Sequence, residues 1–383
     1  MIYLDANATT PVLPEVLDTM MPWLREGYAN PSGSYAAAKL SRKAIEAARL
    51  QVADLIGVAP DEIVFTGGGT ESVNTALRSL DALVGKGAAV VSAVEHSAVL
   101  RCVERLDREV RLVPVDTGGR LDVAAYQAAL KGAAFVSIMA ANNETGVIQP
   151  LREATEFARS LGLPVHSDAI QAAGKIDLDV KRLGVDMLSL SAHKFHGPKG
   201  VGALYVRKGM KFEPLIVGGG QEGERRSGTE HTAGIVGMGA AAACLLRDMK
   251  AASQARLRDE FEGKILTEVA GVTVNGDLEH RLPNTSHLSF EHCEAAGLLI
   301  LLDEAGVACS AGSACMTGKQ RPSHVQLAMG ISEARAKSSL RVSFSRLNTM
   351  EEALAAADAV KKAVEKLRRV QGTGVGPVVV YTP

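Results

Sequence analysis

The chain has 383 residues, of which 46% are hydrophobic and 22% are charged, and its formal net charge is −1. This length allows two domains and a sizeable core. The near-neutral charge and the aromatic content of 4% argue against nucleic-acid binding, which normally needs a basic face and stacking platforms.

The lack of a targeting signal and the cysteine usage favour a cytoplasmic protein. The N-terminus shows no basic segment followed by an apolar one, and no apolar run reaches the length of a membrane span, so neither a signal peptide nor a membrane partner is expected. The cysteines form an odd set without regular spacing: Cys102, Cys244, Cys293, Cys309 and Cys315. A reducing location is therefore expected, with any special cysteine reactive rather than bridged.

Short apolar runs alternate with helical patterns between residues 35 and 210. Strands are predicted over Glu62–Thr66, Ala88–Ala93, Val110–Val115, Ala134–Met139, Leu163–His166, Val185–Leu190 and Val201–Val206. Helices are predicted over Ser41–Ile56, Val123–Leu130 and Leu151–Leu161. This alternation of continuous apolar strands with helices indicates an α/β fold with a mostly parallel sheet covered on both faces. Ligands of such sheets bind beyond the carboxyl ends of the strands.

A second unit is predicted after the sheet region. One long helical segment over Thr232–Val269 links the two, and a strand, helix, strand and helix follow over Arg281–Phe290, Ala296–Glu304, Leu340–Ser343 and Met350–Val370. This pattern indicates a smaller α+β domain. The expected division is 14–255 for the large domain, and 1–13 with 256–383 for the small one. The tail 371–383 has no helical period and is expected to form an edge strand or a flexible arm.

The first candidate binding segment runs from Phe65 to Ser72, in the order Phe-Thr-Gly-Gly-Gly-Thr-Glu-Ser. Gly69 and Thr70 lie where a glycine loop opens a helix, and backbone amides at such a point can bind a phosphate. A tight turn with a threonine cap explains the same residues equally well. The spacing matches no nucleotide fingerprint, so a single small phosphate is expected.

Two further clusters follow predicted strands. His96, in Glu95-His96-Ser97, could stack on a planar ring or move a proton, although a lone histidine is more often a cap or a core residue. Asn143 lies in the loop Asn142–Gly146, which could bind a carboxylate or a phenolic oxygen, or could be only a turn.

Asp168 and Lys194 each lie directly after a buried predicted strand. A lysine amine can form a Schiff base with an aldehyde, and a carboxylate can keep a pyridine nitrogen protonated, so this pair meets the minimal requirement for pyridoxal phosphate. Gln171, Ser191 and His193 accompany the pair. Each residue has an innocuous alternative, such as a helix cap or a surface charge. Their joint position at one edge of one sheet favours the cofactor.

The last candidates lie in the second unit. Cys315 lies among small residues between Gly312 and Gly318 without an apolar period, which is typical of an exposed loop and suits a nucleophilic thiolate. The spacing to Cys309 and the lack of nearby histidines disfavour a metal site. Arg341 alternates with apolar residues on a predicted strand, where its planar fork suits an α-carboxylate, with a structural salt bridge as the alternative.

Taken together, these residues resemble the cysteine desulfurases of the NifS/IscS group, which are class V, aminotransferase-like pyridoxal phosphate enzymes. The likeness is nearly full length and includes Tyr3–Thr10, Asn30–Ser32, Thr70–Ser72, Asn142–Gly146, His193–Gly200, Arg226–Thr229, Ser310–Cys315 and Pro322–His324. It implies the fold type I, aspartate aminotransferase-like architecture and a homodimer. It also implies conversion of L-cysteine to L-alanine, with sulfur held on Cys315 as a persulfide for a sulfur-acceptor protein such as an iron–sulfur scaffold. Selenocysteine lyase or another class V aminotransferase is the alternative.

The resemblance also implies a role for each candidate. Lys194 would form the Schiff base, Asp168 would face the pyridine nitrogen, and Gln171 would donate to the ring hydroxyl. His96 would stack on the ring and assist proton transfers. Asn143 and Arg341 would bind the substrate carboxylate. The phosphate would be held by Gly69, Thr70, Ser191 and His193, with Thr229 contributed by the second subunit. Cys309 is expected to be inert, a regulatory disulfide with Cys315 being the alternative. The acceptor protein is left open, because the tail does not resemble the C-terminal arm of the housekeeping members.

Overall fold

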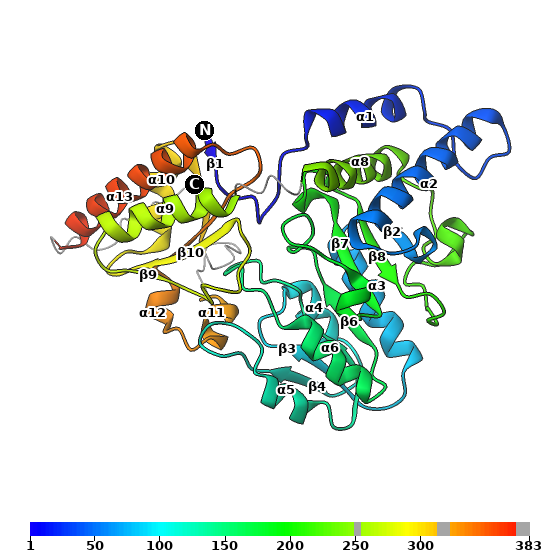
Figure 1. The fold of residues 1–383 in the computed structure, drawn as a ribbon, viewed down its shortest axis with the longest axis horizontal. Helices are drawn as coiled ribbons and strands as arrows, with labels where there is room; N and C mark the ends of the chain where they lie inside the picture. The colour runs from blue at the N-terminus through cyan, green and yellow to red at the C-terminus, as the bar shows by residue number, and fades with distance from the viewer. Residues whose placement is uncertain (249–253, 312–321, 373–383) are drawn as a thin grey trace, which may run out of the picture.

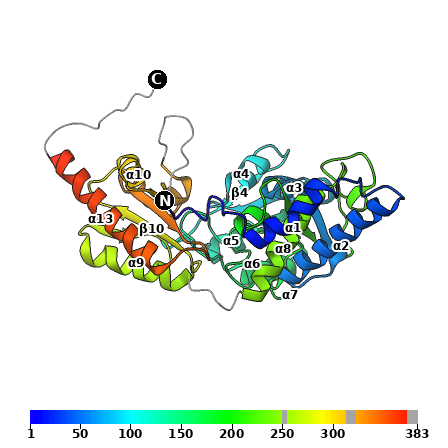
Figure 2. The same cartoon turned by 90° about the horizontal axis from the view of Figure 1, so that it is seen from above.

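The computed structural model describes residues 1–248, 254–311 and 322–372. Figure 1 shows two lobes, the larger built from β2–β8 with its helices and the smaller from β9, β10, α9, α10 and α13. Both views place β1 with the smaller lobe, after which the chain crosses to α1 in the larger one (Figures 1 and 2). Among the helices of the described ranges, none is both long and apolar enough to cross a membrane.

The larger lobe contains a seven-stranded sheet in the order β2-β8-β7-β6-β5-β3-β4. Its strands are β2 (Ile63–Thr66), β3 (Ala88–Ser92), β4 (Val110–Val113), β5 (Ala133–Ser137), β6 (Val165–Asp168), β7 (Met187–Ser191) and β8 (Gly202–Val206). All pairings from β7 to β4 are parallel, and β8 runs antiparallel to both of its neighbours. The prediction of a mostly parallel sheet is confirmed, with the strand ends shifted by a few residues.

Helices cover both faces of this sheet, because successive residues of each strand point to opposite sides and both sides are apolar. One face, which carries Phe65 and Leu190, packs against α1 (Pro14–Arg25), α2 (Ala36–Ile56), α5 (Val123–Ala129), α6 (Leu151–Ser160) and α8 (Thr232–Asp248). The other face, which carries Val64 and Leu204, packs against α3 (Gly69–Leu83) and α4 (Ser97–Val103). The short helix α7 (Val180–Leu183) precedes β7.

The smaller lobe contains a four-stranded antiparallel sheet in the order β12-β13-β10-β9. Its strands are β9 (Val272–Val274), β10 (Thr285–Phe290), β12 (Ser310–Ala311) and β13 (Ser339–Ser343). The helices α9 (Gln254–Glu268), α10 (Ala295–Glu304) and α13 (Met350–Gly372) enclose a separate core, in which Phe261 and Phe344 meet edge to face. The predicted smaller α+β unit is therefore confirmed, whereas its boundaries at residues 13/14 and 255/256 stay a prediction.

Two short helices connect the smaller lobe to the larger one. They are α11 (His324–Ala328) and α12 (Glu333–Ala336). Val325 and Met329 pack against Val94, Val115 and Met139 of the larger lobe. The segment after residue 321 is thereby docked beside the ends of β3 and β5.

The segment predicted as one helix over Thr232–Val269 is described as two helices, and residues 249–253 between them lie outside the described part of the chain. α8 ends at Asp248 and α9 begins at Gln254, and the two helices lie in different lobes (Figure 1). α8 packs against α1 and α2, whereas α9 packs against α13. The helical pattern continued through the junction because no glycine or proline interrupts residues 240–262. Residues 371 and 372 belong to α13, and the rest of the predicted tail lies outside the described residues.

The N-terminal segment crosses between the lobes. β1 (Ile2–Tyr3) pairs with β11 (Val307–Ala308), and Asp5 forms a bridge with Ser343 of β13. Further along, the Thr10 backbone N–H donates to the His193 carbonyl at 2.9 Å. Residues 5–10 therefore lie between β13 and the end of β7.

Candidate functional site

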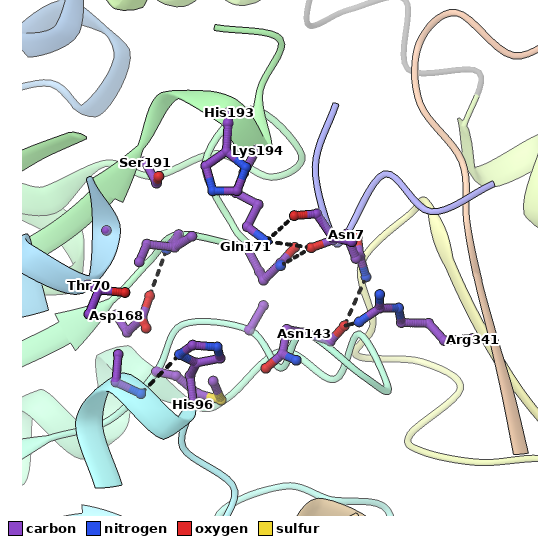
Figure 3. A pocket seen from close by; sticks show the side chains of 16 residues that line it. Asn7, Thr70, His96, Asn143, Asp168, Gln171, Ser191, His193, Lys194 and Arg341 are labelled. Atoms are coloured by element: carbon purple, nitrogen blue, oxygen red, sulfur yellow. Dashed lines mark hydrogen bonds between the residues drawn. The ribbon is translucent and has the colours of Figure 1, made fainter. Parts of the chain in front are cut away.

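A cavity of about 380 Å³ lies where the parallel strands of the large sheet end (Figure 3). The N-terminal segment and β13 supply its remaining wall. Sequence-predicted residues that line it are Gly69, Thr70, His96, Asn143, Asp168, Gln171, Ser191, His193, Lys194 and Arg341. Thr229 is exposed and does not line this cavity. Cys315 lies outside the described residues.

The glycine loop forms one wall because α3 begins at Gly69, directly after β2. Gly68 has a φ of 144°, which favours glycine. A Cβ on Gly69 would lie 2.4 Å from Ile170 Cδ1, so any side chain there would press into the cavity lining. The first amides of α3 therefore lie open beside the cavity, an arrangement that suits an anion.

Glu71, in the first turn of α3, connects the glycine loop to a distant segment. Its Oε2 accepts from the Gly67 N–H at 2.8 Å, and its Oε1 pairs with Arg226 Nε at 2.9 Å. Both partners of this ion pair are partly buried. The segment that carries Thr229 is therefore held next to the glycine loop.

Asp168 is the last residue of β6, between β5 and β7, and is 4% exposed. Its Oδ1 accepts from the Ile170 N–H at 3.0 Å. Burial raises the pKa of Asp168 to about 6, against the opposing effects of that N–H and of Lys194. A buried carboxylate of this kind is stabilised by a positively charged partner in the cavity.

Glu95 and His96 follow β3. His96 Nδ1 accepts from the Ala98 N–H at 3.1 Å, so this residue caps α4 and also lines the cavity. Burial, with Lys194 and His324 nearby, lowers the pKa of His96, which favours a neutral ring. Glu95 Oε1 accepts from the Met139 N–H at 2.6 Å, and burial raises the pKa of Glu95 well above its ordinary value.

Lys194 ends the short 3-10 helix η2 (Ala192–Lys194) that follows β7. Its Nζ donates to the carbonyl oxygens of Asn7 at 2.6 Å and Ala8 at 2.8 Å. Burial lowers the pKa of Lys194 to about 8, and Arg341 acts in the same direction. At pH 8 about half of this amine is unprotonated and can act as a nucleophile or a base.

Arg341 projects from β13 toward the N-terminal segment and the 142–146 loop. Its Nη2 pairs with Asp5 at 2.6 Å, and its Nη1 donates to the Asn143 carbonyl at 3.1 Å. The side chain is buried, and its Nε has no hydrogen-bond partner within the described part of the chain. The salt-bridge alternative is therefore realised, with one buried donor left over.

Cys309 lies between β11 and β12 and is only partly exposed. Burial raises the pKa of the Cys309 thiol to about 12, with Asp5 adding to the effect. A thiol in this state is a weak nucleophile at neutral pH, which supports the prediction of an inert cysteine.

Sequence reasoning assigned no role to Asn7, Lys175 or Asp5. Asn7 lines the cavity, and its carbonyl accepts from both Lys194 and Gln171. Lys175 donates to the side chains of Asn7 and Gln171. The polar run around Asn7 and a lysine in the turn after Asp168 were visible signals. Their contact joins residues 168 positions apart, which no local pattern reveals.

Comparisons with known proteins show which family and which solved structures this chain is similar to. The aminotransferase class-V family model matches residues 2–355. A cysteine desulfurase of Cereibacter sphaeroides is 44% identical, over 98% of this chain and 99% of the relative. A solved NifS-like protein is similar with a TM-score of 0.87 at 35% identity, over 97% of this chain and 99% of that one. SspA, solved in complex with cysteine, has a TM-score of 0.80 at 36% identity, over 90% and 99% of the two chains.

Proposed function

The chain belongs to the aminotransferase class-V family and, within it, to the cysteine desulfurases, and from this premise we propose that it works with pyridoxal phosphate and passes sulfur through Cys315. The observation that carries the cofactor proposal is the presence of Lys194 and Asp168 in one cavity beside the glycine loop. The proposed reaction converts L-cysteine to L-alanine.

The cavity residues fit pyridoxal phosphate. The open amides of α3 and the close approach of Gly69 to Ile170 suit a phosphate, and the buried Asp168 suits a protonated ring nitrogen. Lys194 supplies the amine that would hold the aldehyde. When bound, the cofactor withdraws the electron pair left on the substrate α-carbon.

The proposed roles of the chain's own residues follow from their environment. Lys194 moves the α-proton, because its pKa of about 8 leaves an unprotonated fraction near neutral pH. His96, whose lowered pKa favours a neutral ring, would help to hold the cofactor ring in the cavity. Arg341 binds the substrate carboxylate, which would satisfy the buried Nε donor, and Asn143 assists.

Cys315 is the proposed sulfur acceptor, and this role stays a prediction. Its thiolate would attack the substrate sulfur and form an S–S bond while the carbon–sulfur bond breaks. The electron pair of the broken bond stays with the carbon, which takes up a proton, so that alanine leaves and Cys315 holds a persulfide. The persulfide sulfur would then pass to an acceptor protein, for which an iron–sulfur scaffold is proposed.

We further propose a homodimer in which Thr229 of each subunit reaches the phosphate site of its partner. The exposure of Thr229, and its position three residues after Arg226 beside the glycine loop, support this arrangement. The cytoplasmic location, like the expected lack of nucleic-acid and membrane partners, stays a prediction.

A single-turnover experiment tests the proposal. L-Cysteine is added to the purified, cofactor-loaded protein without reductant, and alanine and protein-bound sulfane sulfur are quantified. We expect about one persulfide per active site, lost in Cys315→Ala and retained in the matched control Cys309→Ala. Alanine and sulfur release at the wild-type rate in Cys315→Ala would exclude Cys315 as the acceptor. A keto acid in place of alanine would indicate an aminotransferase.

A further inference from the structure

Lys175 lies in the turn after β6 and does not itself line the cavity. Its Nζ donates to Asn7 Oδ1 at 2.9 Å and to Gln171 Oε1 at 2.7 Å. A lysine nitrogen carries at least two hydrogens in either protonation state. Both contacts therefore hold whether or not Lys175 is charged.

These contacts decide how the Gln171 amide is oriented. The two ends of an amide have nearly the same shape, and their hydrogen-bond partners determine which end is which. Because the Lys175 amine donates, the amide must turn Oε1 toward it. Nε2 then faces the other way, where it donates to the Asn7 carbonyl at 2.8 Å (Figure 3). The same carbonyl accepts from Lys194 Nζ at 2.6 Å, so Nε2 lies beside the reactive amine.

The Asn7 side chain is fixed by the same amine. Its Oδ1 accepts from Lys175 and, at 3.1 Å, from Asn284 Nδ2. Its Nδ2 donates to Thr285 Oγ1 at 2.9 Å and to the Asn143 carbonyl at 3.2 Å. All partners are thus in place on both ends of this amide, and its backbone carbonyl is held where Lys194 and Gln171 meet.

We infer that Lys175 is a positioning residue, which fixes the Gln171 and Asn7 side chains so that Gln171 presents a hydrogen-bond donor, and not an acceptor, to the cavity. The inference rests on the proposed function, because a donor at this point serves the ring oxygen of bound pyridoxal phosphate. Lys175 acts only through these two side chains.

The charged groups around Lys175 bear on any titration of the site. Burial holds the pKa of Lys175 well below its ordinary value, and Lys194 and Arg341 act in the same direction. His196 also faces Lys175 and carries a lowered pKa, chiefly because it is buried. If the Lys175 amine is neutral, its removal therefore changes the local charge little. The main effect is then the loss of the hydrogen bond that orients the Gln171 amide.

The test is the pH titration of the visible absorbance band of the cofactor-loaded protein. A donor to the ring oxygen favours the unprotonated chromophore, so Lys175→Met should raise the midpoint by about one unit, a tenfold gain in proton affinity. Gln171→Ala should give a similar rise. The double variant should show no further rise, because both changes remove the same interaction. Lys181→Met, at an exposed lysine on α7, is the control and should leave the midpoint unchanged.

Two results would overturn the inference: a wild-type midpoint in folded Lys175→Met, or shifts that add in the double variant. If Lys175→Met does not fold, Lys175→Gln replaces it. This side chain keeps a donor but is too short to reach both oxygens, and it should shift the midpoint in the same direction. Failure of the wild-type protein to form any visible band would instead refute the proposed function.

Discussion

Replacement of Arg341 by alanine should separate substrate binding from structural support. Arg341 is 8% exposed, and two nitrogens of its guanidinium already contact Asp5 and the Asn143 carbonyl. A third, Nε, is buried without a partner in the described residues. The α-carboxylate of L-cysteine is the ligand that would use this donor.

The size of the effect follows from burial. An exposed ion pair contributes at most about 1 kcal/mol, whereas loss of one partner of a buried, hydrogen-bonded charge pair costs about 2–5 kcal/mol. At about 1.4 kcal/mol for each factor of ten, Arg341→Ala should lower kcat/KM for L-cysteine by roughly 30-fold to 4000-fold. Most of the change should lie in KM, because the carboxylate is bound in the ground state as well as in the transition state.

The matched control is Asp5→Asn, which breaks the same ion pair but leaves the guanidinium in place. Steady-state alanine release over a range of L-cysteine concentrations measures both variants, with thermal unfolding as the check on folding. Asp5→Asn should leave KM unchanged or lower it, because the substrate no longer competes with Asp5 for Arg341. Equal losses of kcat/KM in the two variants would refute the carboxylate-binding role and leave only the salt bridge.

Three further predictions concern stability and the second cysteine. Cys309→Ala should keep persulfide formation, because burial holds the pKa of Cys309 at about 12, and a loss of protein-bound sulfur would contradict this. In the apoprotein, the lowered pKa of Lys194 means that stability is lost as pH falls from 10.5 toward about 8. Lys194→Met should remove this pH dependence of the free energy of unfolding, which amounts to about 3 kcal/mol and is measured by urea unfolding at several pH values. If the free energy of unfolding of the variant changes with pH as steeply as that of the wild type, the amine is not buried. Glu222 accepts two buried hydrogen bonds from Arg49, so Glu222→Gln should lower the free energy of unfolding by about 3–5 kcal/mol. Glu46→Gln, at the exposed partner of the same arginine, should lower the free energy of unfolding by less than about 1 kcal/mol. Equal losses in the Glu46 and Glu222 variants would show that burial does not determine the strength of these ion pairs.

Much of the fold could be predicted because the large sheet is buried on both faces. Its strands are continuous apolar runs, and that signal is local. The division of residues 232–269 between two cores could not be predicted, for the opposite reason. α8 and α9 pack in different cores, and a helical period does not indicate which partner each half will meet.

The candidate site could be predicted where each functional residue lies at the end of a single strand. Gly69, His96, Asp168 and Lys194 each follow a buried strand, and the parallel topology brings those ends together. Lys175 also follows β6, but its importance comes from a contact with Asn7, which no local pattern reveals. The prediction that Asn143 binds a ligand addressed its amide, whereas the structure uses its carbonyl as an acceptor for Arg341.

The crossing of residues 5–10 between the lobes has a consequence for how the protein is made. The Asn7 N–H donates to Ser343 Oγ, a residue 336 positions later in the chain. Ribosomes synthesise proteins from the N-terminus, so the segment that supports Lys194 leaves the ribosome 336 residues before this partner. The large sheet can fold while synthesis continues. The cavity, however, can be completed only after β13 has emerged.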